Sequence, residues 1–171
     1  MTEAVVALGS NLGDRLGILQ SGVDALADLP EVEVMAISPV YETAPVGGPA
    51  QPDYLNAVMR LRTSLGPRDL LGRLHDIEAA SGRVRDARWG PRTLDLDIIT
   101  YGDLVSSDPV LTVPHPRAAE REFVLAPWHD LDPDATMPGA GPVADRLADL
   151  RADAGTAGLR RTEFTLKAVK R

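Results

Sequence analysis

Four stretches of this chain have the hydrophobic and polar patterning of β-strands. Residues 3–9 form a short apolar run, and residues 31–43, 54–63 and 94–101 alternate between apolar and polar side chains. Side chains two apart on a strand share one face, so alternation of this kind is typical of a packed sheet. Residues 162–169 alternate as well, and we expect that this tail could add an edge strand.

Helical spacing of apolar residues separates these stretches. Residues 16–26 carry leucine and valine on one helical face, after Asn11 and Asp14, whose side chains suit a helix start. A second helix is predicted from the proline at the start of 67–82, and an amphipathic helix near 142–152. Between the predicted elements, proline- and glycine-rich segments predict loops.

The order of these elements predicts an α+β fold. Strand–helix–strand followed by strand–helix–loop–strand is the split βαβ arrangement of a ferredoxin-like core. We expect an antiparallel sheet with helices packed on it, loops at 44–53 and 83–93, and a C-terminal extension that begins with an irregular, proline-containing stretch. No repeat or linker divides the sequence, so residues 1–171 are predicted to form a single domain.

Composition narrows the function classes. The chain has 171 residues, a formal net charge of −7 and a pI near 4.9, which disfavours general binding to nucleic acids or anionic membranes. Cysteine is absent, so disulfides, thiolate nucleophiles and cysteine-bound metals are excluded. With neither a signal peptide nor a long apolar run in the sequence, we expect a cytoplasmic protein without membrane or nucleic-acid partners.

Arginine is concentrated in one part of the chain. Six of the sixteen arginines fall between positions 83 and 121, where six carboxylates balance them. A neutral, arginine-dense region in an acidic protein suggests a local anion site, because guanidinium groups bind phosphates through paired hydrogen bonds. These arginines are Arg83, Arg85, Arg88, Arg92, Arg117 and Arg121.

The segment RWGPRTLDLD at 88–97 places two carboxylates beside this arginine-rich region. On a strand, Asp95 and Asp97 point to one face while the leucines beside them point to the other. A paired carboxylate suits Mg²⁺, which takes phosphate oxygens and water as its remaining ligands. Such a pair could also be a solvated strand face, but Arg92 nearby favours a metal and phosphate site for phosphoryl transfer.

Aromatic and amide side chains suggest a second subsite. Tyr54 and Asn56 share a strand face, and a ring beside an amide can hold a flat heterocycle. Phe123 is a candidate for the same subsite, although it could be a core aromatic. Trp89, which could otherwise pack in the core, suggests a loop that closes on ligand. His115, in a loop beside two arginines, is a candidate anion contact.

Four blocks of the sequence together resemble one enzyme family. They are ALGSNLGDR at 7–15, YETAPVGGPAQPDYLNAV at 41–58, GRVRDARWGPRTLDLDII at 82–99 and LTVPHPRAAEREFVLAP at 111–127. The chain resembles the 6-hydroxymethyl-7,8-dihydropterin pyrophosphokinases of folate biosynthesis over residues 3–130. The resemblance implies a monomer with a ferredoxin-like core that transfers pyrophosphate from ATP to the pterin hydroxymethyl group and releases AMP.

The resemblance also implies roles for individual residues. Two Mg²⁺ ions would be held by Asp95 and Asp97, and the transferring group would be steadied by Arg83 and Arg92. The remaining implied ATP contacts are His75, Glu78, Arg85, Arg88, Trp89, Ile98, Thr112, His115 and Arg121. The implied pterin contacts are Thr43, Ala44, Pro45, Val46, Tyr54, Asn56, Trp89 and Phe123.

Two other interpretations compete with this one. A ferredoxin-like domain could bind RNA on its sheet, with Tyr54 and Phe123 stacking on bases, but the acidic pI and the missing RNP sequence disfavour it. The second interpretation is a non-catalytic relative, and the presence of both aspartates with Arg83 and Arg92 argues against it.

His75 and Glu78 could also be ordinary polar residues at a helix boundary.

Overall fold

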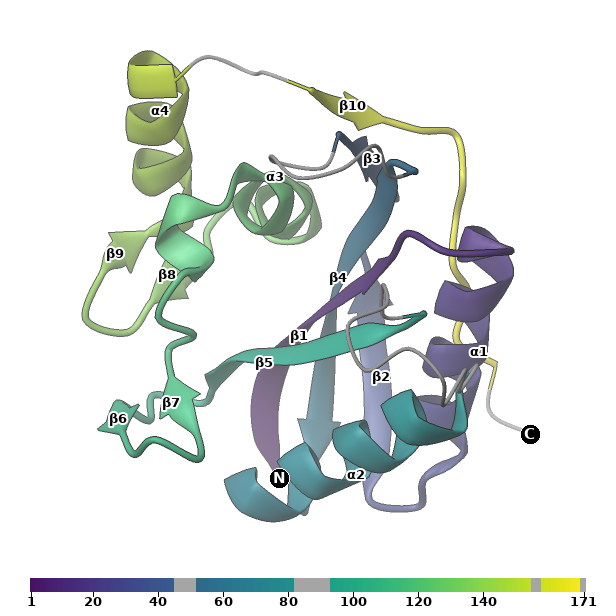
Figure 1. Cartoon of the computed structure of the whole chain (residues 1–171). Coiled ribbons are helices and arrows are strands. Elements are labelled where there is room, and N and C mark those ends of the chain that lie inside the picture. Colours follow the sequence, from purple (N-terminus) through teal and green to yellow (C-terminus); the bar gives the residue numbers. More distant parts are fainter. Residues whose placement is uncertain (45–51, 82–92, 155–157, 170–171) are drawn as a thin grey trace.

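The computed structural model describes residues 1–44, 52–81, 93–154 and 158–169. An antiparallel six-stranded sheet lies at its centre, with two helices on each face (Figure 1). The strands are ordered β10-β3-β4-β1-β5, and β2 also pairs with β4. Their bounds are β1 Thr2–Ser10, β2 Val32–Ile37, β3 Tyr41–Thr43, β4 Tyr54–Thr63, β5 Asp95–Tyr101 and β10 Leu159–Arg161.

Four α-helices and several short elements complete the fold. The helices are α1 Arg15–Asp28, α2 Pro67–Ala80, α3 Glu122–Leu131 and α4 Val143–Ala154. The short elements are β6 Ser106–Ser107, β7 Thr112–Val113, the 3₁₀ turn η1 Ala118–Glu120, β8 Thr136–Met137 and β9 Gly141–Pro142. Within the described ranges, none of these helices has the length and apolar character needed to cross a bilayer.

Both faces of the sheet are packed against helices. On β1, Val6 and Leu8 face α1 and α2 in one hydrophobic core, while Val5 faces α3 and α4 in a second core. The α+β prediction with a ferredoxin-like strand order is therefore confirmed, and the second pair of helices covers the sheet face that an RNA-binding module would leave open.

Helix starts follow the local sequence as predicted. The carboxylate of Asp14 caps α1 by accepting a hydrogen bond from the Gly17 backbone N–H at 3.1 Å. Gly17 leaves room for this cap, since a Cβ there would lie 2.2 Å from the Asp14 carboxylate. Pro67 is the first residue of α2, where its missing N–H costs no helical hydrogen bond.

The predicted strand at 31–43 is interrupted. Residues 32–37 and 41–43 pair with different ends of β4, and the strand is interrupted at Ser38 and Pro39. The Ser38 hydroxyl accepts a hydrogen bond from the Val58 N–H at 2.9 Å, and Pro39 has no N–H to continue a ladder. The Ser38 N–H still donates to the Val58 carbonyl at 2.8 Å, so the ladder is interrupted by the side-chain bond and the proline without separating the two strands.

Helix α3 lies in the stretch that was expected to be irregular. Pro127 is its sixth residue, and the apolar run around it is buried against β4 and α4. Burial of this run offsets the hydrogen bond that the proline removes. The prediction of an amphipathic helix near 142–152 is confirmed by α4.

The C-terminal segment adds an edge strand, but earlier than expected. The strand is β10, which pairs with β3, whereas residues 162–169 form no strand. After β10, the Thr162 N–H and hydroxyl both donate to the Val40 carbonyl, at 2.9 and 2.7 Å, and the Val40 N–H donates to the Phe164 carbonyl at 3.4 Å. The chain then crosses to the other core, where Leu166 is buried.

Charged side chains tie β10 to its neighbours. Glu42 on β3 forms ion pairs with Arg15 and Arg160, and Arg161 pairs with Asp130 on α3 at 3.4 Å. The Arg160 guanidinium beside Glu42, together with Arg15, lowers the pKa of that carboxyl below its ordinary value. These pairs anchor β3 between the two ends of the chain.

Candidate active site

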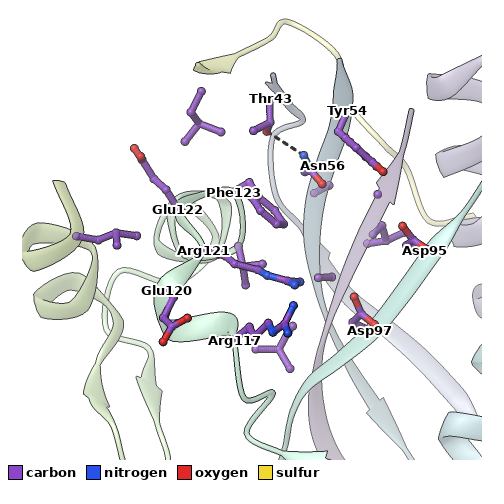
Figure 2. A pocket seen from close by; sticks show the side chains of 18 of the residues that line it. Thr43, Tyr54, Asn56, Asp95, Asp97, Arg117, Glu120, Arg121, Glu122 and Phe123 are labelled. Atoms are coloured by element: carbon purple, nitrogen blue, oxygen red, sulfur yellow. Dashed lines mark hydrogen bonds between the residues drawn. The ribbon is translucent and has the colours of Figure 1, made fainter. Parts of the chain in front are cut away.

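A cavity of about 1010 Å³ lies between the sheet and the segment that contains η1 and α3. Its sheet side comes from β1, β4 and β5, and Figure 2 shows side chains from the two sides facing one another. Ala7 and Gly9 form part of the sheet side, and Gly9 pairs with Asn56 on one neighbour strand and Asp95 on the other. Small residues on this central strand leave space between the polar groups of the two outer strands.

Gly9 is required by a close approach. A Cβ at this position would lie 3.0 Å from the Asn56 Oδ1 atom. The backbone there does not have a positive φ, so the constraint comes from the neighbouring amide.

Asp95 and Asp97 both line the cavity from β5. Leu96 and Ile98 between and after them are buried in the core on the other face, as the alternation predicted. No group of three or more His, Cys, Asp or Glu residues in the described part of the chain could hold a metal ion. A cation bound by this pair would therefore take further ligands from substrate or water, a mode that suits Mg²⁺.

An aromatic and amide subsite lies at the other end of the cavity. Asn56 is 7% exposed, and its Nδ2 donates a hydrogen bond to the Thr43 Oγ1 at 2.9 Å, which fixes the orientation of the amide (Figure 2). Phe123 enters from the first turn of α3, and Tyr54 enters from β4. Burial, and the charge of Asp95, raise the pKa of the Tyr54 phenol.

Two arginines face the acidic pair. Figure 2 shows the guanidinium groups of Arg117 and Arg121 directed into the cavity toward Asp95 and Asp97. The Arg121 guanidinium lies 5.5 Å from the centroid of the Phe123 ring, a cation–π distance. The cavity therefore has a charged end suited to phosphate and metal, and an aromatic end suited to a flat heterocycle.

His115 lies close to this charged end. Its Nδ1 accepts a hydrogen bond from the Arg117 backbone N–H at 3.2 Å, and its backbone N–H donates to the Ile99 carbonyl at 2.8 Å. Burial lowers the pKa of His115, the charge of Asp97 opposes that shift, and the charges of Arg121 and Arg117 lower the pKa further. The imidazole is thus favoured in its neutral form.

Five of the predicted ATP contacts among the described residues lie outside the lining of the cavity, namely His115 and the four that follow. His75 is exposed on α2, and the Glu78 carboxylate accepts a hydrogen bond from the Leu96 N–H on β5 at 3.0 Å. Ile98 packs into the core beneath α1 and α2, so a contact with ATP there would have to use its backbone. Thr112 donates its hydroxyl proton to the Asp108 carbonyl at 3.0 Å.

The remaining predicted contacts are placed as follows. Thr43 and Ala44 line the cavity at the end of β3. Seven other predicted contacts lie outside the described residues, so their roles stay predictions; these are Pro45, Val46, Arg83, Arg85, Arg88, Trp89 and Arg92.

Several lining residues received no role from the sequence. Arg117 belongs to the arginine-rich region, and its position two residues after His115 was the available signal. Glu120 and Glu122 also line the cavity, although Figure 2 shows their side chains directed away from the acidic pair. Leu150 and Leu159 come from the C-terminal extension and had no detectable signal, because only the fold brings them to this site.

Comparison with known proteins gives consistent matches. Residues 5–133 match the family model for 7,8-dihydro-6-hydroxymethylpterin-pyrophosphokinase (HPPK). The chain is similar to 2-amino-4-hydroxy-6-hydroxymethyldihydropteridine pyrophosphokinases from two bacteria. The Pseudomonas aeruginosa protein is 47% identical over 143 residues, covering 84% of this chain and 88% of that relative. The Mycobacterium leprae protein is 43% identical over 180 residues, covering 98% of this chain and 92% of that relative.

Solved structures support the fold. A crystal structure of wild-type Plasmodium falciparum HPPK-DHPS with SDX-DHP superposes with a TM-score of 0.76 at 13% identity. The match covers 98% of this chain and 48% of that one, so the chain spans about half the length of the larger protein. At this identity the likeness concerns the arrangement of the elements alone.

Proposed function

The chain belongs to the 7,8-dihydro-6-hydroxymethylpterin-pyrophosphokinase family, and we propose that the cavity between the sheet and α3 is its active site. The family's reaction is the transfer of pyrophosphate to hydroxymethyldihydropterin in folate biosynthesis, with ATP as co-substrate, and this is the function of the chain. We place the pterin at the aromatic end of the cavity and the ATP phosphates at the charged end.

The charged end suits a magnesium–phosphate complex. Asp95 and Asp97 supply two carboxylates on one strand face, and we assign them two Mg²⁺ ions shared with ATP. When bound, such ions neutralise charge that develops on the phosphate oxygens. Arg121 adds a guanidinium group on the opposite side, and Arg83 and Arg92 are proposed to steady the transferring group from the adjoining segment.

The aromatic end suits a pterin ring. Tyr54 and Phe123 offer ring faces, and the Asn56 amide can both donate to and accept from the edge of a heterocycle. Its bond to Thr43 orients this amide before substrate arrives, which lowers the entropic cost of binding. The backbone from Thr43 to Val46 is proposed to complete the edge contacts, and Trp89 to close over the ring.

This placement orders the reacting groups in one line. The pterin hydroxymethyl oxygen approaches the β-phosphorus of ATP and forms a new oxygen–phosphorus bond. The bond from the β-phosphorus to the α-phosphate oxygen breaks, AMP leaves with that oxygen, and the hydroxyl proton is released to solvent. The chain contributes positioning and charge stabilisation, which are the main needs of phosphoryl transfer. His115, with its neutral imidazole, is proposed to contact ATP as a hydrogen-bond partner, as are Thr112, His75, Glu78 and the Ile98 backbone.

The whole chain is proposed to act as one domain, because Leu159 from the C-terminal extension lines the same cavity as Asp95. Arg85 and Arg88 are proposed as further ATP contacts. A monomeric state, a cytoplasmic location and the absence of nucleic-acid or membrane partners remain predictions.

The observation that carries this site assignment is the placement of Asp95 and Asp97 opposite Arg121 in one cavity. Replacement of Asp97 by Asn keeps the shape of the side chain and removes its charge. We expect Mg²⁺-dependent release of AMP to fall by at least about 1000-fold, while the melting temperature changes little. Asp103→Asn, in the exposed turn after β5, is the matched control and should retain wild-type activity. Near-normal turnover by Asp97→Asn would show that the metal site is assigned wrongly.

A further inference from the structure

The side chain of Arg117 makes no hydrogen bond that stabilises the local backbone of the described residues. Its backbone N–H donates to the His115 Nδ1, and its carbonyl accepts from the Glu120 N–H at 3.0 Å, so the turn before η1 is held without the Arg117 side chain. The side chain is exposed and lines the cavity. Removing it should therefore leave the turn intact.

The direction of this side chain is informative. In Figure 2 the Arg117 guanidinium lies beside that of Arg121, and both face Asp95 and Asp97 across the cavity. Among the described residues, no carboxylate lies within ion-pair distance of the Arg117 guanidinium, and its side chain has no hydrogen bond there. Glu120, the nearest acid in sequence, points away.

Two neighbouring guanidinium groups repel each other unless an anion lies between them. Arg121 is held by its contact with the Phe123 ring, which leaves Arg117 as the more adjustable of the two. Both arginines lie close enough to the His115 imidazole for their charges to lower its pKa, so they lie near the same end of the cavity. The arrangement suits a phosphate chain that Arg121 binds from a fixed position and that Arg117 binds from the exposed side of the cavity.

We propose that Arg117 is a further phosphate-binding arginine, which contacts the triphosphate of ATP from the side opposite Asp97. This inference rests on the proposed site and adds a residue to it. Arg117 contacts only the nucleotide, so its loss raises the KM for ATP and leaves the KM for the pterin unchanged. A charge-assisted hydrogen bond at an exposed position corresponds to a change of about 10-fold.

The test compares Arg117→Ala and Arg117→Lys with the control Arg62→Ala. Arg62 lies near the far end of β4, where it pairs with Glu33 at 3.9 Å. We expect the KM for ATP to rise about 10-fold in Arg117→Ala and less in Arg117→Lys, with the KM for the pterin within twofold of wild type. Added guanidinium ion should partly restore the rate of Arg117→Ala alone. Calorimetry with magnesium and α,β-methylene-ATP should show the same loss of affinity.

The outcomes separate this inference from the site assignment. If Asp97→Asn is inactive but Arg117→Ala has a wild-type KM for ATP, the role of Arg117 is wrong and the site stands. A rise in both KM values by the same factor would also overturn it, because it would indicate a general disturbance of the site. If Asp97→Asn is fully active, the site assignment fails and the role of Arg117 fails with it.

Discussion

Replacement of Gly9 by alanine tests the pterin subsite through a residue that has no side chain of its own. The new Cβ would lie 3.0 Å from the Asn56 Oδ1, and ordinary contacts begin near 3.4 Å, so the amide must move by about 0.4 Å. The same amide donates to Thr43 at 2.9 Å and is 7% exposed, so it has little room to move.

Displacement of the Asn56 amide should therefore weaken binding of the pterin substrate. Misplacing the amide weakens one or two hydrogen bonds to the pterin edge, each contributing about 0.5–1.5 kcal/mol, and the added methyl group narrows the cavity floor. We expect the KM for the pterin to rise about 10-fold and the KM for ATP to stay within twofold. Stability should change by less than about 1 kcal/mol, because alanine is favoured over glycine in a strand and offsets part of the crowding.

The assay is AMP release at saturating ATP across a range of pterin concentrations, together with thermal unfolding. Gly72→Ala on α2 is the matched control, because its Cβ would meet no atom within 4 Å. It should raise stability by up to about 1 kcal/mol and leave both KM values unchanged. A Gly9→Ala enzyme with a wild-type KM for the pterin, or with an equal rise in both KM values, would refute the reasoning.

Three further predictions follow from contacts around the cavity. Phe123→Leu keeps an apolar side chain but removes the ring, so the KM for the pterin should rise about 10-fold in the same assay. The KM for ATP should rise less, because the variant also removes the ring that holds Arg121; an unchanged pterin KM would contradict the stacking role. Glu42→Gln removes two partly exposed ion pairs beside Thr43 and should lower the free energy of unfolding by about 1 kcal/mol in urea titrations at pH 7. Because the pKa of Glu42 is lowered in the folded state, this difference should shrink as the pH falls through 4.5, and a constant difference would argue against the ion pairs. The pKa of His115 should lie below 6.5 by NMR titration, and it should fall further in Asp97→Asn, which removes the charge that opposes the shift. Because the folded state resists protonation of His115, the free energy of unfolding should decrease as the pH falls below 6.5. A pKa that rises in Asp97→Asn would contradict the placement of His115 near Asp97.

Much of the sheet could be predicted from sequence because its pattern is local. The alternation over 54–63 coincides with β4, and the register of Asp95 and Asp97 follows from the buried leucines beside them. The pattern over 31–43 did not reveal the break at Ser38, since that break depends on a hydrogen bond to Val58, a residue 20 positions away.

Other features depend on tertiary packing. The prolines around α3 suggested irregular structure, but burial of the run near Trp128 in the second core favours a helix. The edge strand lies at 159–161 instead of 162–169, because its position depends on pairing with β3, which is distant in the sequence. In the site, residue type identified the acidic pair and the aromatic residues, whereas Leu159 reaches the cavity only through the fold.

A crystal structure with magnesium, a non-hydrolysable ATP analogue and 6-hydroxymethyl-7,8-dihydropterin tests the site assignment most directly. The account predicts metal density shared by Asp95, Asp97 and the phosphates, with the pterin ring between Tyr54 and Phe123. It also predicts that the pterin hydroxymethyl oxygen points toward the β-phosphorus. Metal bound away from both aspartates, or a pterin bound outside the cavity between the sheet and α3, would contradict the account.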